Sequence, residues 1–227
     1  MSDASDRMDG VAETDASSFV VLLRAVAGEL PVHRDELNRL DGVAGDGDLG
    51  LTVAAACRAL LDLAPALEAL PEPEAIRKAG LEIARRAPST GGTLIAFALM
   101  AAAKANVPPD APPIERAAAY LDAATQSMAE RGKVARGDRT MLDALGPAAD
   151  AVRGAIARGD DPATAAAEAA GAADGGATAT ATMAAKVGRA GWLAERAAGH
   201  EDAGARLVAL AFAAAARATT TAGVEAG

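Results

Sequence analysis

Apolar side chains recur at helical spacing along almost the whole chain, and this pattern restricts the fold more than any other feature. Residues 17–30 illustrate it with Phe19, Val20, Leu22, Leu23, Val26 and Leu30. No segment shows the apolar–polar alternation or the β-branched enrichment of strands. Aromatic residues make up only 2% of the chain, so alanine and leucine must fill the core, and such small side chains favour close helix packing. The sequence therefore predicts an all-α protein of about eight amphipathic helices.

These helices are expected to form one domain over residues 16–222, after a disordered leader at 1–15 and before a tail at 223–227. The predicted helices are 17–30, 33–40, 52–63, 74–87, 94–105, 114–131, 141–158, one or two between 162 and 187, and 205–220. Three prolines predict a connection over 64–73, and 192–204 is expected to be a loop. Glycine-rich stretches follow about every second helix, which would bring several of them to one end of an antiparallel bundle.

Charge and composition exclude several classes of protein. The net charge of −9 argues against a partner that is a nucleic acid or an anionic membrane. Cys57 is the only cysteine, which excludes intrachain disulfides and multi-thiolate metal sites. The first residues lack the basic and apolar regions of a signal peptide, and no stretch is long and free enough of charge to span a bilayer. We expect a cytoplasmic location.

Residues 40–50 combine three aspartates and four glycines between two helical runs. Asp41, Asp46 and Asp48 offer the oxygen ligands that Mg²⁺ prefers, and the glycines allow tight turns. The helix that follows would direct its free N–H groups at the loop, where they suit a phosphate. A plain Asp/Gly connection is the alternative reading, whereas a calcium loop of the EF-hand kind is excluded by the spacing.

Weaker signals lie elsewhere in the chain. Residues 89–93 offer hydroxyls and N–H groups to an anion, although this pattern is also common where helices stop and start. Arg189 is a candidate phosphate partner or a surface arginine, and Met141 a candidate adenine contact or a core residue. His33 and His200 are the only histidines, and neither has the spacing of a catalytic or metal-binding group. Phosphoryl transfer here would depend on metal ions and positioning, with any base supplied by another chain.

Four blocks in order resemble the nucleotide-binding L subunit, or C-terminal L domain, of dihydroxyacetone kinases. They are Leu37–Asp41 with Gly45–Gly50, then Gly91–Thr93, then Gly137–Asp143, and last Gly188–Ala190 through Glu195–Arg196 and Gly199–His200 to Asp202–Ala205. The resemblance implies a closed barrel of eight antiparallel amphipathic helices that holds ADP or ATP at one end through two Mg²⁺ ions.

The resemblance also implies a role for each matching position, and no acid/base residue in this chain. Asp41, Asp46 and Asp48 would ligate magnesium. Gly50, Thr52 and Thr93 would lie against the phosphates, Arg189 would pair with a phosphate, and Gly132, Met141, Asp202, Ala203 and Gly204 would surround the adenosine. Leu49 stands beside the phosphates where the family usually has histidine. Leu94 and Ile95 replace a usual Ser-Gly pair, and Ala203 a usual proline.

The implied activity is phosphoryl transfer to dihydroxyacetone or a related small ketose, which a separate K-type subunit binds covalently through a histidine. The sequence is compatible with exchangeable ATP and with a resident ADP that a phosphocarrier protein recharges. A homodimer is also compatible with it. The departures at Leu49 and Leu94 keep a second hypothesis open, a non-catalytic regulatory or scaffold protein of the same fold with weakened nucleotide binding.

Overall fold

The computed structural model describes residues 18–108, 110–186 and 194–225, and within them all regular structure is helical. Eight helices have twelve or more residues: α1 (Ser18–Glu29), α3 (Leu49–Glu68), α4 (Glu72–Arg86), α5 (Thr90–Ala102), α6 (Pro113–Gly132), α7 (Leu142–Arg158), α8 (Pro162–Ala179) and α11 (Ala203–Glu225). Shorter elements are η1 (Leu30–His33), α2 (Arg34–Asp41), η2 (Thr180–Thr182) and α10 (Ala194–Ala197). The prediction of an all-α protein with about eight main helices is confirmed.

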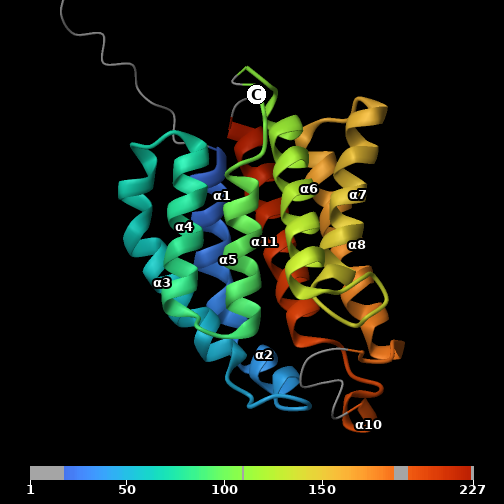
Figure 1. Ribbon diagram of the computed structural model, residues 1–227. Helices are drawn as coiled ribbons and strands as arrows, with labels where there is room; N and C mark the ends of the chain where they lie inside the picture. Colours follow the sequence, from blue (N-terminus) through green and yellow to red (C-terminus); the bar gives the residue numbers. More distant parts are fainter. Residues whose placement is uncertain (1–17, 109, 187–193, 226–227) are drawn as a thin grey trace, which may run out of the picture.

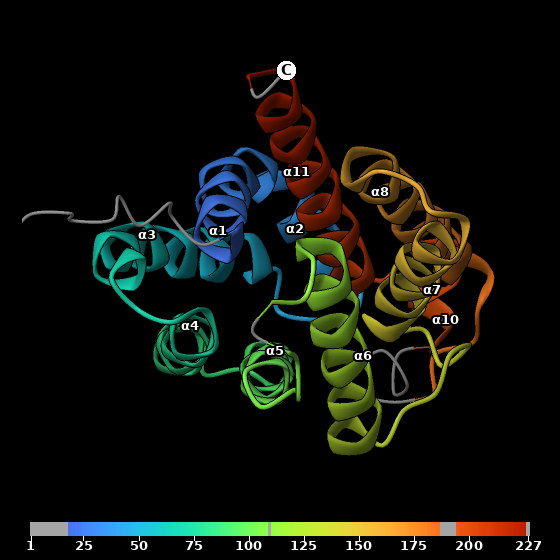
Figure 2. The same ribbon diagram turned by 90° about the horizontal axis from the view of Figure 1, so that it is seen from above.

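The eight long helices form a closed antiparallel ring (Figure 2). Each packs against the next in chain order, and α11 packs against α1 to close the barrel. Because successive helices run in opposite directions, alternate connections gather at one end of the barrel (Figure 1). That end carries α2 with the acidic loop, the α4–α5 turn, the α6–α7 connection and the segment that leads to α11, as the spacing of the glycine-rich stretches predicted.

Two kinds of packing hold the ring together. On one side α1 and α3 bury leucine and valine side chains against α4, among them Val20, Leu60 and Leu67. On the other side α7, α8 and α11 meet through alanines, and every buried residue of α8 is alanine. Gly176 brings α8 so close to α7 that a Cβ at this position would collide with the Asp143 backbone oxygen. Small side chains therefore set the close spacing that the composition predicted.

Tertiary packing corrects several predicted boundaries. α3 continues through Pro65 to Glu68, because Ala64 and Leu67 are both fully buried and their packing outweighs the cost of a proline inside a helix. α5 begins at Thr90 instead of 94, since the Ser89 side chain caps it by accepting from the Gly92 N–H. The predicted connection over 64–73 is thus shortened to the few residues before α4.

The C-terminal third of the chain departs further from the prediction. Of the one or two helices expected between 162 and 187, the structure has one, α8, which runs unbroken through Gly175 and Gly176 and ends at Ala179. A 3-10 turn follows it, then irregular backbone over 183–186. α10 lies within the expected loop at 192–204. α11 continues to Glu225, beyond the expected domain end at 222. The predicted leader at 1–15 lies outside the described residues.

By length and hydropathy one described helix, α3, could cross a membrane. The apolar side chains of α3 also pack against α1 and α4 in the core of the barrel, and a core helix meets the same length and hydropathy criteria.

Candidate functional site

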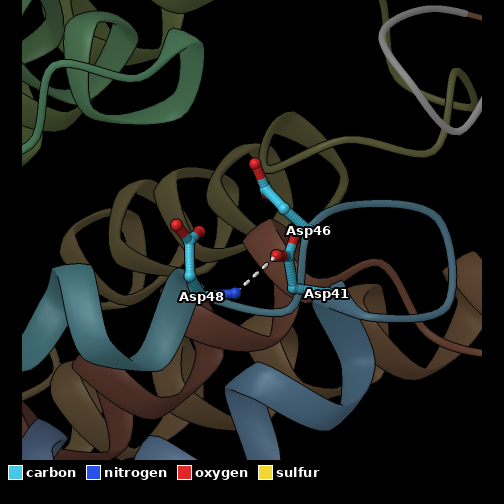
Figure 3. A group of neighbouring side chains, drawn as sticks. All are labelled: Asp41, Asp46 and Asp48. Carbon is cyan, nitrogen blue, oxygen red and sulfur yellow. Dashed lines mark hydrogen bonds between the residues drawn. The ribbon is translucent and has the colours of Figure 1, made fainter.

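Three aspartates gather where the chain passes from α2 into α3 (Figure 3). Asp41 is the last residue of α2, Asp46 lies in the loop and Asp48 precedes α3. One carboxylate oxygen from each lies within 4.8 Å of the others, with Asp41 partly buried and the other two exposed. The structure thus brings together all three predicted magnesium ligands.

The Asp41 carboxylate is held in place by the loop that it supports. Its Oδ2 accepts hydrogen bonds from the Gly47 N–H at 2.8 Å and from the Asp48 N–H at 3.2 Å. Gly47 has a φ of +77°, which glycine adopts without strain, and a Cβ at Gly45 would collide with the Asp41 carboxylate. The two glycines therefore allow the loop to wrap around one aspartate.

Asn38 fixes the start of α3 against the same loop. Its side-chain oxygen accepts from the Gly50 N–H at 2.7 Å and from the Leu51 N–H at 3.3 Å. These two amides are therefore not free for a phosphate, which corrects the expectation of an uncapped helix start. Gly50 is also required by packing, since a Cβ there would collide with the Arg34 backbone oxygen. Thr52, one turn into α3, is half-buried.

Three carboxylates this close repel one another in water unless a cation lies between them. An oxygen-only donor set that is partly exposed suits a hard divalent cation that keeps some of its water, as Mg²⁺ does. The residues present therefore fit the predicted metal.

The predicted adenosine contacts also lie at this end of the barrel. Met141 is buried directly before α7, and a Cβ at Gly204 would lie 2.7 Å from its Cγ. Gly132 ends α6 beside Leu94, whose Cδ1 would lie 3.6 Å from a Cβ at that position. Thr93 is exposed in the first turn of α5. Arg189 lies outside the described residues.

Asp202 caps a helix and is partly buried. Its Oδ1 accepts from the Ala205 N–H at 2.8 Å at the start of α11, and its own N–H donates to the Thr180 hydroxyl at 2.8 Å. Burial raises the pKa of the Asp202 carboxyl, and two backbone N–H groups and Arg139 oppose this rise only in part. Ala203 and Gly204 follow it as the first two residues of α11.

Arg139 is a key residue of this end that sequence reasoning did not single out. It is 4% exposed and has a φ of +64°. Its guanidinium donates to the backbone oxygens of Thr180 at 3.2 Å, Ala197 at 3.0 Å and His200 at 2.9 Å. It lies within the matched block at 137–143, but nothing local in the sequence indicates that an arginine there is buried.

Asp143 closes the same connection from the other side. Its carboxylate accepts hydrogen bonds from the N–H groups of Gly137 and Thr140. The block at 137–143 therefore fixes the α6–α7 connection and, through Arg139, the approach to α11.

Three of the four positions that depart from the family pattern, Leu49, Leu94 and Ile95, take part in apolar packing. Leu49 packs against the core of α1 and α3, and Leu94 against the cluster around Met128 and Met141. Ile95 contacts both of these cores. Leucine at 49 and 94 therefore adds core contacts where a polar side chain would add hydrogen-bonding capacity.

The arrangement defines a class of protein, a closed helical barrel with a carboxylate cluster and several helix starts at one end. A family model, the DAK2 domain, matches residues 43–217. The chain belongs to the DAK2 domain family.

Several curated relatives are named as kinases. A putative 3,4-dihydroxy-2-butanone kinase of Solanum lycopersicum is 36% identical over 74% of this chain and 29% of that protein. A D-erythrulose kinase of Mycolicibacterium smegmatis is 34% identical over 82% of this chain and 32% of that protein. The chain thus spans about a third of the length of these relatives. The ADP-binding subunit DhaL of the PEP-dependent dihydroxyacetone kinase of Escherichia coli is 27% identical over 76% of this chain and 82% of that protein.

Solved structures agree with the family assignment. The native dihydroxyacetone kinase of C. freundii superposes with a TM-score of 0.69 at 27% identity, covering 96% of this chain and 38% of that one. The same kinase in complex with AMP-PNP and Mg²⁺ gives a TM-score of 0.67 at 26% identity, covering 96% of this chain and 37% of that one. The barrel is therefore the dihydroxyacetone kinase fold, and a protein of this fold has been observed with a nucleotide and magnesium.

Proposed function

We propose that this chain is the nucleotide-binding L subunit of a dihydroxyacetone kinase, which presents a phosphoryl donor to a small ketose held by a K-type partner. The observation that carries the proposal is the gathering of Asp41, Asp46 and Asp48 within 4.8 Å at the end of the barrel where the glycine-rich connections meet. The match to DhaL, an ADP-binding subunit, along 82% of its length supports the assignment to the L type.

In this proposal the acidic loop would hold two Mg²⁺ ions together with ADP or ATP. Bound magnesium would neutralise phosphate charge and fix the donor for transfer. Asp41, which accepts hydrogen bonds from two backbone N–H groups, would set the position of the ligand set, and the exposed Asp46 and Asp48 would supply the other carboxylates. Thr52, Thr93 and Arg189 are assigned to the phosphates.

The adenosine is assigned to the buried side of the same end. Met141 would contact the base, with Gly132, Ala203 and Gly204 leaving room beside it and Asp202 available to the ribose. No side chain of this chain is assigned a proton transfer. The K-type partner is assigned the ketone and any general base. If the ADP is resident, a phosphocarrier protein would recharge it.

A second candidate function is a non-catalytic regulatory or scaffold protein of the same fold. It is favoured by Leu49 and Leu94, whose side chains pack into the apolar cores and therefore contribute no polar group to a phosphate. This candidate predicts weak nucleotide binding and no transfer to a ketose when a K-type partner is added.

Calorimetric titration of Mg·ATP and Mg·ADP into the native chain and its Asp46→Asn variant tests the proposal. Asp46 is exposed, so the variant should fold normally and yet lose at least tenfold in affinity, about 1.4 kcal/mol, because one metal ligand is lost. Chelation of magnesium should have the same effect on the native chain.

The matched control is Asp62→Asn, an exposed aspartate on α3 outside the cluster. It should bind the nucleotide as the native chain does. Equal affinity in Asp46→Asn and the native chain would refute the metal assignment. Magnesium-dependent binding without ketose phosphorylation in the presence of a K-type partner would favour the scaffold candidate.

A further inference from the structure

An open hollow of about 490 Å³ lies behind the acidic loop, between α2 and the segment around α10. Its lining residues are Asn38, Arg39, Gly42, Val43, Arg196 and His200. None of the three clustered aspartates is among them, nor are Thr93 and Met141. The hollow is therefore separate from the candidate nucleotide site, although both share the loop that begins at Gly42.

The hollow is cationic in a protein of net charge −9. Arg39 and Arg196 are exposed, and neither forms an ion pair with an acidic side chain that the structure describes. Most other arginines do form such pairs, as Arg24 does with Glu68 and Arg206 with Glu201. None of the described residues that line the hollow is acidic. Two arginines thus line the same space, and neither is paired with an acidic side chain among the described residues.

The remaining lining adds donors. Because the Asn38 side-chain oxygen already accepts from Gly50 and Leu51, the group that Asn38 can offer to a ligand is its NH₂. His200 is exposed and also lines the hollow. A planar guanidinium matches the oxygens of a phosphate in a bidentate manner, and a volume of this size accommodates a small phosphorylated molecule.

We propose that this hollow binds the phosphate group of a small phosphorylated metabolite, at a site distinct from the nucleotide. Arg39 and Arg196 would hold the phosphate, with Asn38 and His200 as further donors. Arg39 lies two residues before Asp41 on α2, and Gly42 and Val43 directly follow that aspartate. A bound anion would therefore order the loop that carries the carboxylates, and we expect it to alter the affinity for Mg·nucleotide.

Titration of inorganic phosphate and of dihydroxyacetone phosphate into the native chain, with EDTA present, tests the site itself. We expect saturable binding that falls at least fivefold in Arg39→Gln and in Arg196→Gln and is abolished in the double variant. The exposed Arg58→Gln, on α3, should bind as the native chain does. A ligand held through its phosphate alone would give similar affinities for both probes, whereas tighter binding of the ester would identify a metabolite site.

The outcome is independent of the proposed kinase function. Asp46→Asn should lose Mg·nucleotide and still bind phosphate under EDTA, so that either assignment can fail without the other. Each arginine variant should unfold at the same temperature as the native chain, because its side chain is exposed and makes no ion pair with a described residue. Absence of saturable phosphate binding, or equal loss in Arg58→Gln, would overturn the proposal.

Discussion

The two halves of the candidate site are held in different ways. In the acidic loop, the hydrogen bonds that position Asp41 and cap α3 join residues only 6 to 13 positions apart. In the half assigned to adenosine, Arg139 joins residues 41 to 61 positions away. The first half is built from its own local sequence, whereas the second exists only once the barrel has brought α7 and the approach to α11 together.

This difference assigns different tasks to the two halves. The acidic loop leaves Asp46 and Asp48 exposed, so a change of charge there should affect ligand binding more than stability. Arg139 is buried and satisfies three backbone carbonyls, so its loss should affect stability first. Substitutions on the two sides can therefore test the comparison.

The largest effect is expected for Arg139→Ala. The substitution leaves the carbonyls of Thr180, Ala197 and His200 without their buried donor, and we expect it to lower the free energy of unfolding by about 3 kcal/mol. Urea denaturation followed by circular dichroism measures this change. Affinity for Mg·nucleotide should also fall, because Asp202 and Gly204 would lose their fixed approach.

Arg58→Ala provides the reference for this prediction. Arg58 is exposed on α3, and its loss should change stability by no more than about 0.5 kcal/mol. If Arg139→Ala were no more destabilising than Arg58→Ala, the distinction between a locally built and a barrel-built half would be wrong.

The same distinction explains what could be predicted from the sequence. Helical periodicity gave the all-α barrel, and the density of aspartate and glycine in one short loop gave the carboxylate cluster, because both depend on neighbours in the chain. Residue roles toward the nucleotide rest on family resemblance and stay predictions.

The wrong or missing predictions concern positions whose structure depends on packing against residues far away in the sequence. Pro65 predicts a break in isolation, but burial of Ala64 and Leu67 keeps α3 continuous. The sequence left one or two helices open between 162 and 187, whereas the structure has an unbroken α8 in which Gly176 allows close contact with α7. The role of Arg139 was missed for the same reason, since its three acceptors come from segments far along the chain.

A smaller effect is expected for Asn38→Ala, which probes the local half. It removes the acceptor of the Gly50 and Leu51 N–H groups at the start of α3, and such a cap contributes about 1 kcal/mol. Asn38→Asp keeps an acceptor and should retain most of the stability. A loss in Asn38→Ala as large as that in Arg139→Ala would mean that the acidic loop also depends on the whole barrel.

The smallest effect, and the one with a distinctive pH dependence, is expected for Asp202→Asn. Burial raises the pKa of Asp202 in the folded protein. Above this raised pKa the ionised carboxylate lowers the stability of the folded state. The effect is absent below the pKa of the unfolded chain, about 3.9, because the carboxyl group is then protonated in both states. Asparagine can still accept from the Ala205 N–H, so the variant should be more stable than the native chain at pH 7 by less than about 1 kcal/mol, and the two should converge near pH 3.5. Urea denaturation at the two pH values measures the difference.

The control for the direction of this stability change is Asp161→Asn at the start of α8. Asp161 is also a helix cap, but hydrogen bonds from Thr164 lower its pKa, so its charge is favoured in the folded state. Its stabilising contribution is present above the unfolded pKa and is lost as the pH falls through the lowered one, so the variant should be less stable than the native chain at pH 7. If Asp202→Asn stabilises the protein at pH 7 and Asp161→Asn destabilises it, the unfavourable free energy of the Asp202 charge is due to burial and not to its position as a helix cap. The same sign at both would remove that distinction.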